Sequence, residues 1–454
     1  MSHFSQAIDE LISQVATTKE QDIRIAQPLT SGPNVACIDW LEVQPHFPKF
    51  YWQSRDLREE VVALGKVHTF SEPAPAYTIL GENQRIWGGK SFANSTQSSD
   101  NAPETLLRST ENRSTKNNSK GLAAYFFLPQ IELVRFDNQW SLCVNLADDK
   151  AAIINALQRL SVHASPLPAI ECQIQSVEHC PSAHKWYSQI DDVLKKIRQN
   201  QFKKVVLARK TTVELDSAVS AAQLLKSSWT KNKHSFHFLF ALDESQAFIG
   251  STPERLYSRN GQELETEALA GTIGRGNNQQ KDSELANWLT NDRKNLTENQ
   301  YVVDDIIDRL SPYSDSINVQ ADARLVRLRK VQHLKRDIQA HLKQGINGVQ
   351  LLSALQPTAA VAGLPREAAI RYIHDHEPFS RGWYSGSMGY ISHQKAEFCV
   401  AIRSAFVAEN ELHLYAGAGI VEGSQADVEW NELDKKMATL LSLLEENSVL
   451  GVIS

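Results

Sequence analysis

One lysine of this chain stands where a charged side chain is not expected. Lys204 belongs to the run FKKVVLAR at 202–209, whose alternation predicts a β-strand, and it shares a face with Val206 and Ala208. A lysine on the apolar face of a strand is costly unless it is paired or neutral, and a neutral lysine can act as a general base. The structural alternative is an edge-strand lysine whose ammonium reaches water.

A glutamate after a later strand is a candidate acid. Glu254 lies in the segment GSTPER at 250–255. A carboxylic acid there can protonate a leaving group if burial keeps it neutral. Ion pairing with Arg255, or with another arginine, is the alternative explanation. The sequence therefore offers Lys204 as a base and Glu254 as an acid.

Three further glutamates lie on two predicted helices. In the C-terminal helix, Glu429, Glu432 and Lys436 fall together on one flank of its apolar stripe. Glu298 lies on an earlier, longer helix and could face the same interior. Glutamates that converge from two helices make an oxygen site suited to Mg²⁺, which commonly takes one or two protein carboxylates. A solvated acidic flank is the alternative.

Closely spaced glycines lie between a predicted strand and that final helix. The segment LYAGAGIVEG at 414–423, with Gly417 and Gly419, is similar to a dinucleotide-binding fingerprint. The chain ends at residue 454, which leaves no room for the second strand of a βαβ unit. We therefore reject a nucleotide site and predict a turn whose exposed backbone amides can bind a carboxylate.

The elements that must position these residues change in character along the chain. Residues 1–180 mix short helical and strand patterns, and their polar segment at about 94–120 predicts a mobile surface loop. The region 181–447 is more regular. It is predicted to contain a helix that begins after Ser182, the Lys204 strand, strands at 234–240 and 247–250, a hairpin over 257–268, a long helix over about 283–311, strands at 396–407 and 411–416, and a final helix over about 425–446.

Hairpin connections dominate over βαβ crossovers in this pattern. That predicts an α+β fold with largely antiparallel sheets. We expect one large domain, in which the region 1–180 and the catalytic region 181–447 pack as one unit with helices on the outside of the sheets.

The composition excludes several classes of protein. A net charge of -6 argues against a nucleic-acid binder. No apolar run approaches the roughly 18 residues needed to span a membrane, and the N-terminus lacks the pattern of a secretory signal. The five cysteines are scattered without CxxC spacing, which argues against a zinc site or a disulfide framework. We predict a cytoplasmic protein with reduced thiols.

Nine segments, in this order, resemble the chorismate-utilising enzymes, which include isochorismate, salicylate, anthranilate and aminodeoxychorismate synthases. Together they cover about 181–447, and the resemblance implies the α+β fold of that family. The segments are KVVLAR at 204–209, STPE at 251–254, EALAGT at 267–272, KNLTE at 294–298, VQHL at 331–334, YSG at 384–386, FCVAIRS at 398–404, GAGIV at 417–421, and EWNE at 429–432 followed by Lys436.

Three stretches choose among the members of that family. Aminodeoxychorismate synthases carry a nucleophilic lysine directly before the Gly-Thr of the third segment, where this chain has Ala270. The segment QPTAAVAG at 356–363 resembles the version found in isochorismate synthases. The stretch at 39–53 resembles the isochorismate synthases of menaquinone biosynthesis. Asn295 is a departure, because some relatives place a further acid there.

The resemblance implies a Mg²⁺-dependent conversion of chorismate to isochorismate. Water adds at C2 of the ring while the hydroxyl at C4 leaves and the double bonds shift. By this resemblance Lys204 takes a proton from the water and Glu254 donates one to the departing hydroxyl. Mg²⁺ on Glu298 and Glu432, with Glu429 supplementary, would hold the ring carboxylate. The expected substrate contacts are Gly271, Thr272, His333, Tyr384, Arg403, Gly417, Gly419 and Lys436.

Three alternative functions stay open at this point. Salicylate synthase is the nearest, since it continues from isochorismate by losing pyruvate in the same pocket. A non-catalytic chorismate- or anion-binding module is another. Ala270 leaves ammonia-dependent formation of anthranilate formally open, although the resemblance implies no amidotransferase subunit.

Overall fold

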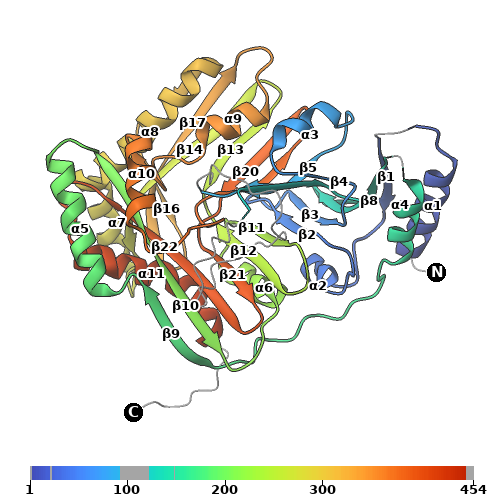
Figure 1. Ribbon diagram of the computed structural model, residues 1–454, viewed down its shortest axis with the longest axis horizontal. Coiled ribbons are helices and arrows are strands. Elements are labelled where there is room, and N and C mark those ends of the chain that lie inside the picture. Colours follow the sequence, from blue (N-terminus) through green and yellow to red (C-terminus); the bar gives the residue numbers. More distant parts are fainter. Residues whose placement is uncertain (1–2, 21–22, 93–121, 148, 446–454) are drawn as a thin grey trace.

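The structure is a computed structural model that describes residues 3–20, 23–92, 122–147 and 149–445 (Figure 1). The predicted loop at 94–120 lies outside the described residues. Among the helices that are described, none combines the length and the apolar character needed to cross a membrane.

Two large sheets form the frame of the fold, and every strand pairing between described residues is antiparallel. The first sheet runs in the order β1 (Arg24–Leu29), β8 (Gln139–Asn145), β7 (Ile131–Phe136), β3 (Glu59–Leu64), β2 (Lys49–Gln53), β11 (Phe236–Ala241), β12 (Gln246–Thr252), β21 (Ser404–Ala408), β22 (Glu411–Ile420), β10 (Lys204–Leu215) and β18 (Gly363–Leu364), and β9 (Ile174–Cys180) also pairs with β10.

The second sheet contains ten strands. Its order is β15 (Ser314–Val319), β17 (Val331–Leu342), β14 (Glu263–Gly274), β13 (Arg255–Asn260), β20 (Lys395–Val400), β19 (Ser387–Ile391), β5 (Ile86–Lys90), β6 (Ala124–Leu128) and β4 (His68–Phe70), and β16 (Arg324–Arg327) pairs with β17. Each sheet takes strands from both of the ranges 1–180 and 181–447. The division into these two regions stays a prediction.

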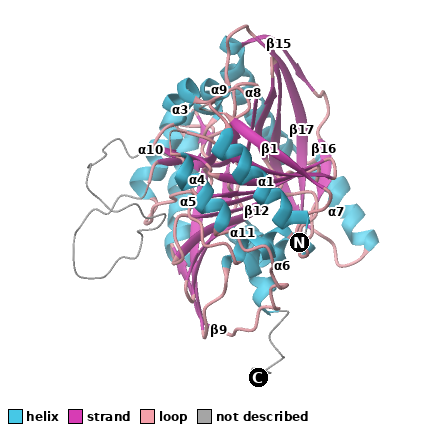
Figure 2. Cartoon of the chain, turned by 90° about the vertical axis from the view of Figure 1, so that its right-hand side faces the viewer, coloured by secondary structure: helices cyan, strands magenta, loops and turns pink. Residues whose placement is uncertain are grey.

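Helices lie around the strands on several sides (Figure 2). Helix α8 packs on β14 and β17, while α11 packs on β22. The described helices are α1 (His3–Thr17), α2 (Cys37–Glu42), α3 (Pro73–Ile79), α4 (Lys150–Gln158), α5 (Ala183–Arg198), α6 (Ala221–Lys231), α7 (Gln279–Asn291), α8 (Arg293–Leu310), α9 (Gly348–Leu355), α10 (Arg366–His376) and α11 (Ala426–Glu445). The predicted α+β class with antiparallel sheets is confirmed.

Aromatic rings hold the two sheets together. Phe50 on β2 and Trp87 on β5 lie with their ring centroids 5.3 Å apart, and Phe127 on β6 stacks on Phe240 on β11. These side chains are buried within one aromatic cluster. Pairs of this kind add packing energy to the burial of a large apolar area. The sheets are therefore joined by an apolar interface. They approach each other at a second place as well, where the candidate active site lies.

The long helix predicted over 283–311 is wrong in one respect, because two helices are present. Helix α7 ends at Asn291 and α8 begins at Arg293. Between them the Asp292 carboxylate accepts a hydrogen bond of 2.9 Å from the Asn295 amide. Aspartate favours this capping position over a helix interior, because its side chain satisfies a free backbone donor. The break starts a new helix just before Glu298.

The single strand predicted over 396–407 is also wrong. Strand β20 ends at Val400 in the second sheet, and β21 begins at Ser404 in the first. The chain changes sheets at 401–403, where Arg403 has a φ of 50°. Such a conformation is uncommon outside glycine and is found at bends and functional sites. The bend carries Arg403 into the space between the two sheets.

Candidate active site

A cavity where the two sheets approach each other collects most of the residues predicted from the sequence. The predicted residues on its wall are Glu254, Gly271, Thr272, Glu298, His333, Tyr384, Arg403, Gly417, Gly419, Glu432 and Lys436. Lys204 and Glu429 are not on this wall.

Different elements deliver these side chains. The first sheet supplies Gly417 and Gly419 on β22, and the second supplies Thr272 on β14 and His333 on β17. Helices α8 and α11 contribute acidic groups from outside the sheets. The sequence brings none of these segments together locally, so the cavity is a product of the tertiary fold.

Lys204 is fully buried behind the cavity wall. Its Nζ lies 3.0 Å from Glu298 Oε1, but the contact is not aligned as a hydrogen bond, so this nitrogen has a charge partner and no hydrogen-bond partner. Strand β10 is covered by β18 and β22 on its two sides at this point. The alternative of a lysine that reaches water from an edge strand is therefore wrong.

Gly417 and Gly419 do not form the predicted turn. They lie within β22, paired with Ala208 and Val206 of β10, because the strand continues past them to Ile420. Their small size serves close approach. A Cβ on Gly419 would lie 2.3 Å from Glu298 Oε1 and 2.9 Å from Lys204 Cε. The glycine thus makes room for the lysine–glutamate pair.

Among the carboxylic acids on the cavity wall, Glu254 has the pKa that departs furthest from its ordinary value. It is fully buried, and this burial, together with the negative charge of Glu267, raises its pKa to about 8. The basic groups of Lys204, Lys436 and Arg403 act in the opposite direction. At neutral pH the group is therefore mostly protonated and can donate a proton. Arg255 pairs with Glu265 and Glu397, so the predicted alternative of a Glu254–Arg255 pair is not observed.

A hydrogen-bonded chain crosses one wall of the cavity. Arg403 Nη2 lies 2.6 Å from His333 Nε2, and His333 Nδ1 lies 2.9 Å from Thr272 Oγ1. Burial and the charge of Arg403 hold the pKa of His333 well below its usual range. Because a guanidinium can only donate, Nε2 accepts and the proton of the neutral ring is on Nδ1. The ring therefore orients Arg403 without adding charge.

Tyr384 and Lys436 line the side formed by β22. The Tyr384 ring stacks on Tyr415 with centroids 5.0 Å apart, and burial raises the pKa of its phenol above the ordinary value. Lys436 Nζ donates to the Gly417 carbonyl at 2.7 Å and pairs with Glu432 Oε1 at 2.7 Å. Lys436 thus presents a fixed positive charge at the cavity, as a site for an anion requires.

Three glutamates predicted as metal ligands each lie beside a lysine. Glu298 pairs with Lys204, Glu432 with Lys436, and Glu429 with Lys294 at 2.6 Å. Burial and the charge of Glu432 raise the pKa of Glu429, so these two carboxyl groups are near each other. Within the residues that the structure describes, no three acidic, histidine or cysteine side chains are gathered as a formed metal site.

The donor chemistry nonetheless fits a magnesium ion. Glu298 and Glu432 both line the cavity, and two carboxylates are the usual protein share of a Mg²⁺ shell. Glu429 lies outside the wall. Asn295 does not line the cavity, and its side-chain oxygen accepts from the Thr272 amide at 3.2 Å.

Sequence reasoning missed the apolar part of the wall. Leu269, Ile402, Val361 and Tyr415 line the cavity as well. Leu269 and Ile402 lie inside recognised motifs, so their position beside predicted site residues could have identified them. Tyr415 lies two residues before Gly417, and the strand period of two places both on one face. Val361 lies in the segment QPTAAVAG at 356–363, which was recognised without a site role.

Comparison with known proteins agrees with this architecture. The family model for the chorismate binding enzyme matches residues 7–445. The chain belongs to the chorismate-binding enzyme family. It is 36% identical over 458 residues to isochorismate synthase MenF of Escherichia coli strain K12, covering 96% of this chain and 100% of that protein. It is 36% identical over 449 residues to isochorismate synthase MenF of Haemophilus influenzae, covering 98% of each chain.

A solved structure carries the similarity into three dimensions. The structure of MenF, the menaquinone-specific isochorismate synthase from Escherichia coli, matches with a TM-score of 0.86 at 35% sequence identity. The match covers 98% of this chain and 100% of that one. The chorismate-binding family thus extends over the N-terminal region, well beyond the nine segments at 181–447.

Proposed function

We propose that this protein is an isochorismate synthase, an isomerase that converts chorismate to isochorismate. The observation that carries the proposal is Glu254, a fully buried carboxyl group on the cavity wall that keeps its proton at neutral pH. The similarity to isochorismate synthases over nearly the whole chain supports the same reaction. A mere binding module would need no neutral acid in this place.

The reaction exchanges one hydroxyl for another across the ring. The oxygen of water forms a bond to C2, the two ring double bonds shift, and the bond between C4 and its hydroxyl breaks. Lys204 accepts the proton of the attacking water, and the Glu254 proton goes to the departing hydroxyl, which leaves as water. Removal of the proton from Lys204 and its return to Glu254 completes the cycle.

The positive groups of the cavity suit a substrate with two carboxylates. We assign Arg403 and Lys436 to these carboxylates, because both present a cationic group at the wall. Thr272 and His333 position Arg403, and Tyr384 forms a wall with a neutral phenol. Gly271, Gly417 and Gly419 line the same cavity.

We propose that Glu298 and Glu432 hold a Mg²⁺ ion, with Glu429 in a supplementary place. When bound, the ion neutralises the carboxylate of the substrate beside acidic side chains. Addition of a chelator should abolish turnover, and Mg²⁺ should restore it. Glu432→Gln should raise the Mg²⁺ concentration needed for half-maximal rate by about 10-fold or more. Full activity of the chelated protein would remove the metal from the proposal.

Separation of the products formed from chorismate tests the reaction itself. Purified protein is incubated with chorismate and Mg²⁺, and the products are resolved by chromatography. Isochorismate as the sole product supports the proposal. Salicylate, detected by its fluorescence, would indicate that the same pocket also expels pyruvate. Anthranilate after addition of ammonium would indicate amination, and binding without consumption would indicate a non-catalytic module.

The biological setting follows from the same similarities. We propose that the enzyme acts in menaquinone biosynthesis, because it matches the menaquinone-specific relative over almost its whole length. We further propose that it works in the cytoplasm without an amidotransferase subunit. Purification of the native enzyme from its cells would test the absence of that subunit, since a stably associated glutaminase would copurify.

A further inference from the structure

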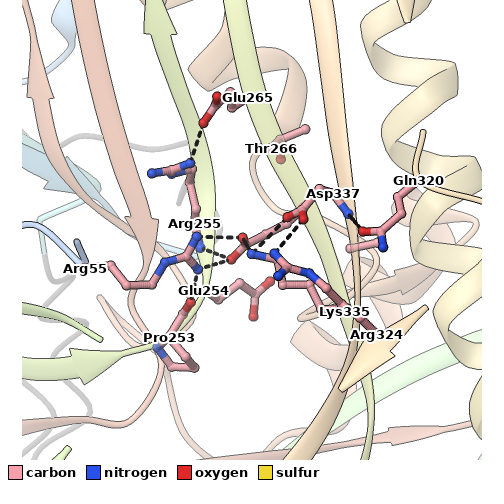
Figure 3. A network of polar contacts seen from close by, with 12 residues as sticks. Arg55, Pro253, Glu254, Arg255, Glu265, Thr266, Gln320, Arg324, Lys335 and Asp337 are labelled. Carbon is pink, nitrogen blue, oxygen red and sulfur yellow. Dashed lines mark hydrogen bonds and ion pairs between the residues drawn. The ribbon is translucent and has the colours of Figure 1, made fainter. Parts of the chain in front are cut away.

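A buried ion-pair network lies behind the acid Glu254 (Figure 3). Its centre is Glu267 on β14, whose side chain is 2% exposed. Arg55 binds the Glu267 carboxylate with both of its terminal nitrogens, at 2.6 and 2.9 Å. Lys335 Nζ lies 2.5 Å from Glu267 Oε2, the oxygen that Arg55 Nη2 also binds. Neither Glu267 nor Arg55 lines the cavity, so neither has a role in the mechanism described above.

The same network forms hydrogen bonds with the backbone on both sides of Glu254. Arg55 Nη1 donates to the Pro253 carbonyl at 2.5 Å, and the Arg255 amide donates to Glu267 Oε1 at 2.8 Å. The residue before Glu254 and the residue after it are thus tied to one ion pair. An arginine and a carboxylate that meet in this bidentate way fix distance and orientation together.

Glu267 is also a fixed negative charge. Burial opposes its ionisation, but the bonds from Arg55, the charge of Lys335 and the Arg255 amide together lower its pKa to about 2. Two nearby buried carboxyl groups resist simultaneous ionisation, so a permanently charged Glu267 favours the proton on Glu254. After burial, this charge is the largest contribution to the raised pKa of Glu254.

We propose that Glu267 is a positioning residue for the reaction, which holds Glu254 in place through the backbone and supplies the fixed charge behind it. The inference rests on the proposed function, in which Glu254 is the acid. Arg55 follows β2, so the N-terminal region would take part in catalysis through this pair.

Other groups around Glu254 also influence its pKa, and most of them act against Glu267. Lys204 on β10, Lys436 on α11 and Arg403 between β20 and β21 all favour its ionised form. Tyr384 and Cys399 face it as well, but burial raises the pKa of each, so both stay neutral at neutral pH. Glu267 is therefore the nearby anion that opposes these three basic groups.

The test follows the titration of Glu254 in two ways. One is the alkaline limb of kcat for isochorismate formation. The other is the infrared band of a protonated carboxyl group, assigned to Glu254 by its loss in Glu254→Gln. In Glu267→Gln both midpoints should move to lower pH by about one unit or more, because the anion is gone and the charges of Arg55 and Lys335 are uncompensated. Glu267→Asp keeps the charge, so its midpoints should stay near those of the wild type while kcat falls.

A second variant keeps the test informative if Glu267→Gln does not fold. Lys335→Gln removes a positive neighbour from Glu267, so both midpoints should move to higher pH. Glu132→Gln is the matched control, because Glu132 is an equally buried carboxylate with a pKa of about 2 that belongs to another network. It should leave both midpoints unchanged.

The outcomes separate the two proposals. Unchanged midpoints in Glu267→Gln, or equal shifts in the Gln and Asp variants, would overturn the role of Glu267 while the reaction stands. If the wild type forms no isochorismate, the proposed function fails. The infrared midpoints then still decide whether Glu267 controls the proton on Glu254, although its role in the reaction falls with the function.

Discussion

Glu132 and Glu254 are both completely buried carboxyl groups, yet they titrate at opposite ends of the scale. Glu132 on β7 is bound by Arg24, Arg85 and the Trp87 indole, each at 2.8 Å, and although burial opposes ionisation, the two arginines lower its pKa to about 2. Glu254 has the anion Glu267 behind it, and burial raises its pKa to about 8.

The difference teaches that partners, not burial, decide what a buried acid does. A carboxylate held by two guanidinium groups stabilises the fold and has no proton to give. A carboxyl group placed beside a fixed anion keeps its proton and can serve as an acid. The first cluster joins strands, and the second faces a cavity. The variants below test this contrast, from the largest expected effect to the smallest.

Loss of the buried lysine should have the largest effect. Lys204→Ala is expected to lower kcat by at least about 100-fold, because no other base is assigned to the attacking water. Circular dichroism and Mg²⁺-dependent binding of chorismate, followed by fluorescence, should be retained. The exposed neighbour supplies the control, since Lys203→Ala should keep the wild-type rate. A fully active Lys204→Ala variant would remove this residue from the mechanism.

Removal of the acid should come next. Glu254→Gln is expected to lower kcat by about 100-fold or more at neutral pH. In the wild type the rate should fall as pH rises through about 8, because the acid loses its proton there. The variant should lack this alkaline limb, and a normal rate in it would show that another group is the acid.

The same variant should gain stability. The folded state binds the Glu254 proton more tightly than the unfolded state, so the wild type loses stability as pH rises from 4.5 to about 8. Glu254→Gln avoids this loss and should be more stable than the wild type by roughly 4 kcal/mol near pH 8. Urea unfolding across this range measures it. Equal stability at all pH values would contradict the raised pKa.

A smaller loss should follow from crowding the lysine–glutamate pair. Gly419→Ala places a methyl group on the Glu298 carboxylate and the Lys204 side chain, so it should displace both. We expect about a 10-fold loss in kcat or more, measured by isochorismate formation. Ala418→Gly in the same strand is the control, and it should change stability without a comparable change in kcat. Equal rates in wild type and Gly419→Ala would show that the close approach has no catalytic importance.

The structural cluster should respond in stability and not in rate. Glu132→Gln leaves two buried arginines without their carboxylate, which should cost about 3–5 kcal/mol of unfolding free energy at neutral pH. Because its pKa is lowered, the contribution of Glu132 is present above pH 4.5 and is lost as pH falls towards about 2. Urea unfolding at several pH values measures this. The kcat of the folded variant should equal that of the wild type. A large fall in kcat would contradict the purely structural role of Glu132.

Much of the fold could be read from the sequence, with errors at particular residues. Alternation and turns predicted antiparallel strands, and the apolar period predicted α11 almost to its ends. The break at Asp292 was missed, because the helical period of apolar residues continues across it. A single capping carboxylate starts the second helix. The sheet change at Arg403 was missed for a related reason, since an apolar alternation does not record a bend.

Most residues of the candidate site were predictable from the sequence, but their contacts were not. Lys204 was named because it shares the apolar face of a predicted strand, and Glu254 because it follows the end of another strand. Glu267 and Arg55 were not assigned a role, because they are 212 residues apart and only the fold brings them together. Their partner Lys335 comes from a third strand. Long-range ion pairs leave no periodic trace in a sequence.

The sequence by itself determined the class of the fold and the chemical groups available, because strand and helix periods and motif order are local properties. The tertiary structure decided which of these groups carries a proton. Electrostatic free energy depends on distance and on burial, and both are set when two sheets and two helices meet. Hence a glutamate becomes a structural anion in one place and an acid in another.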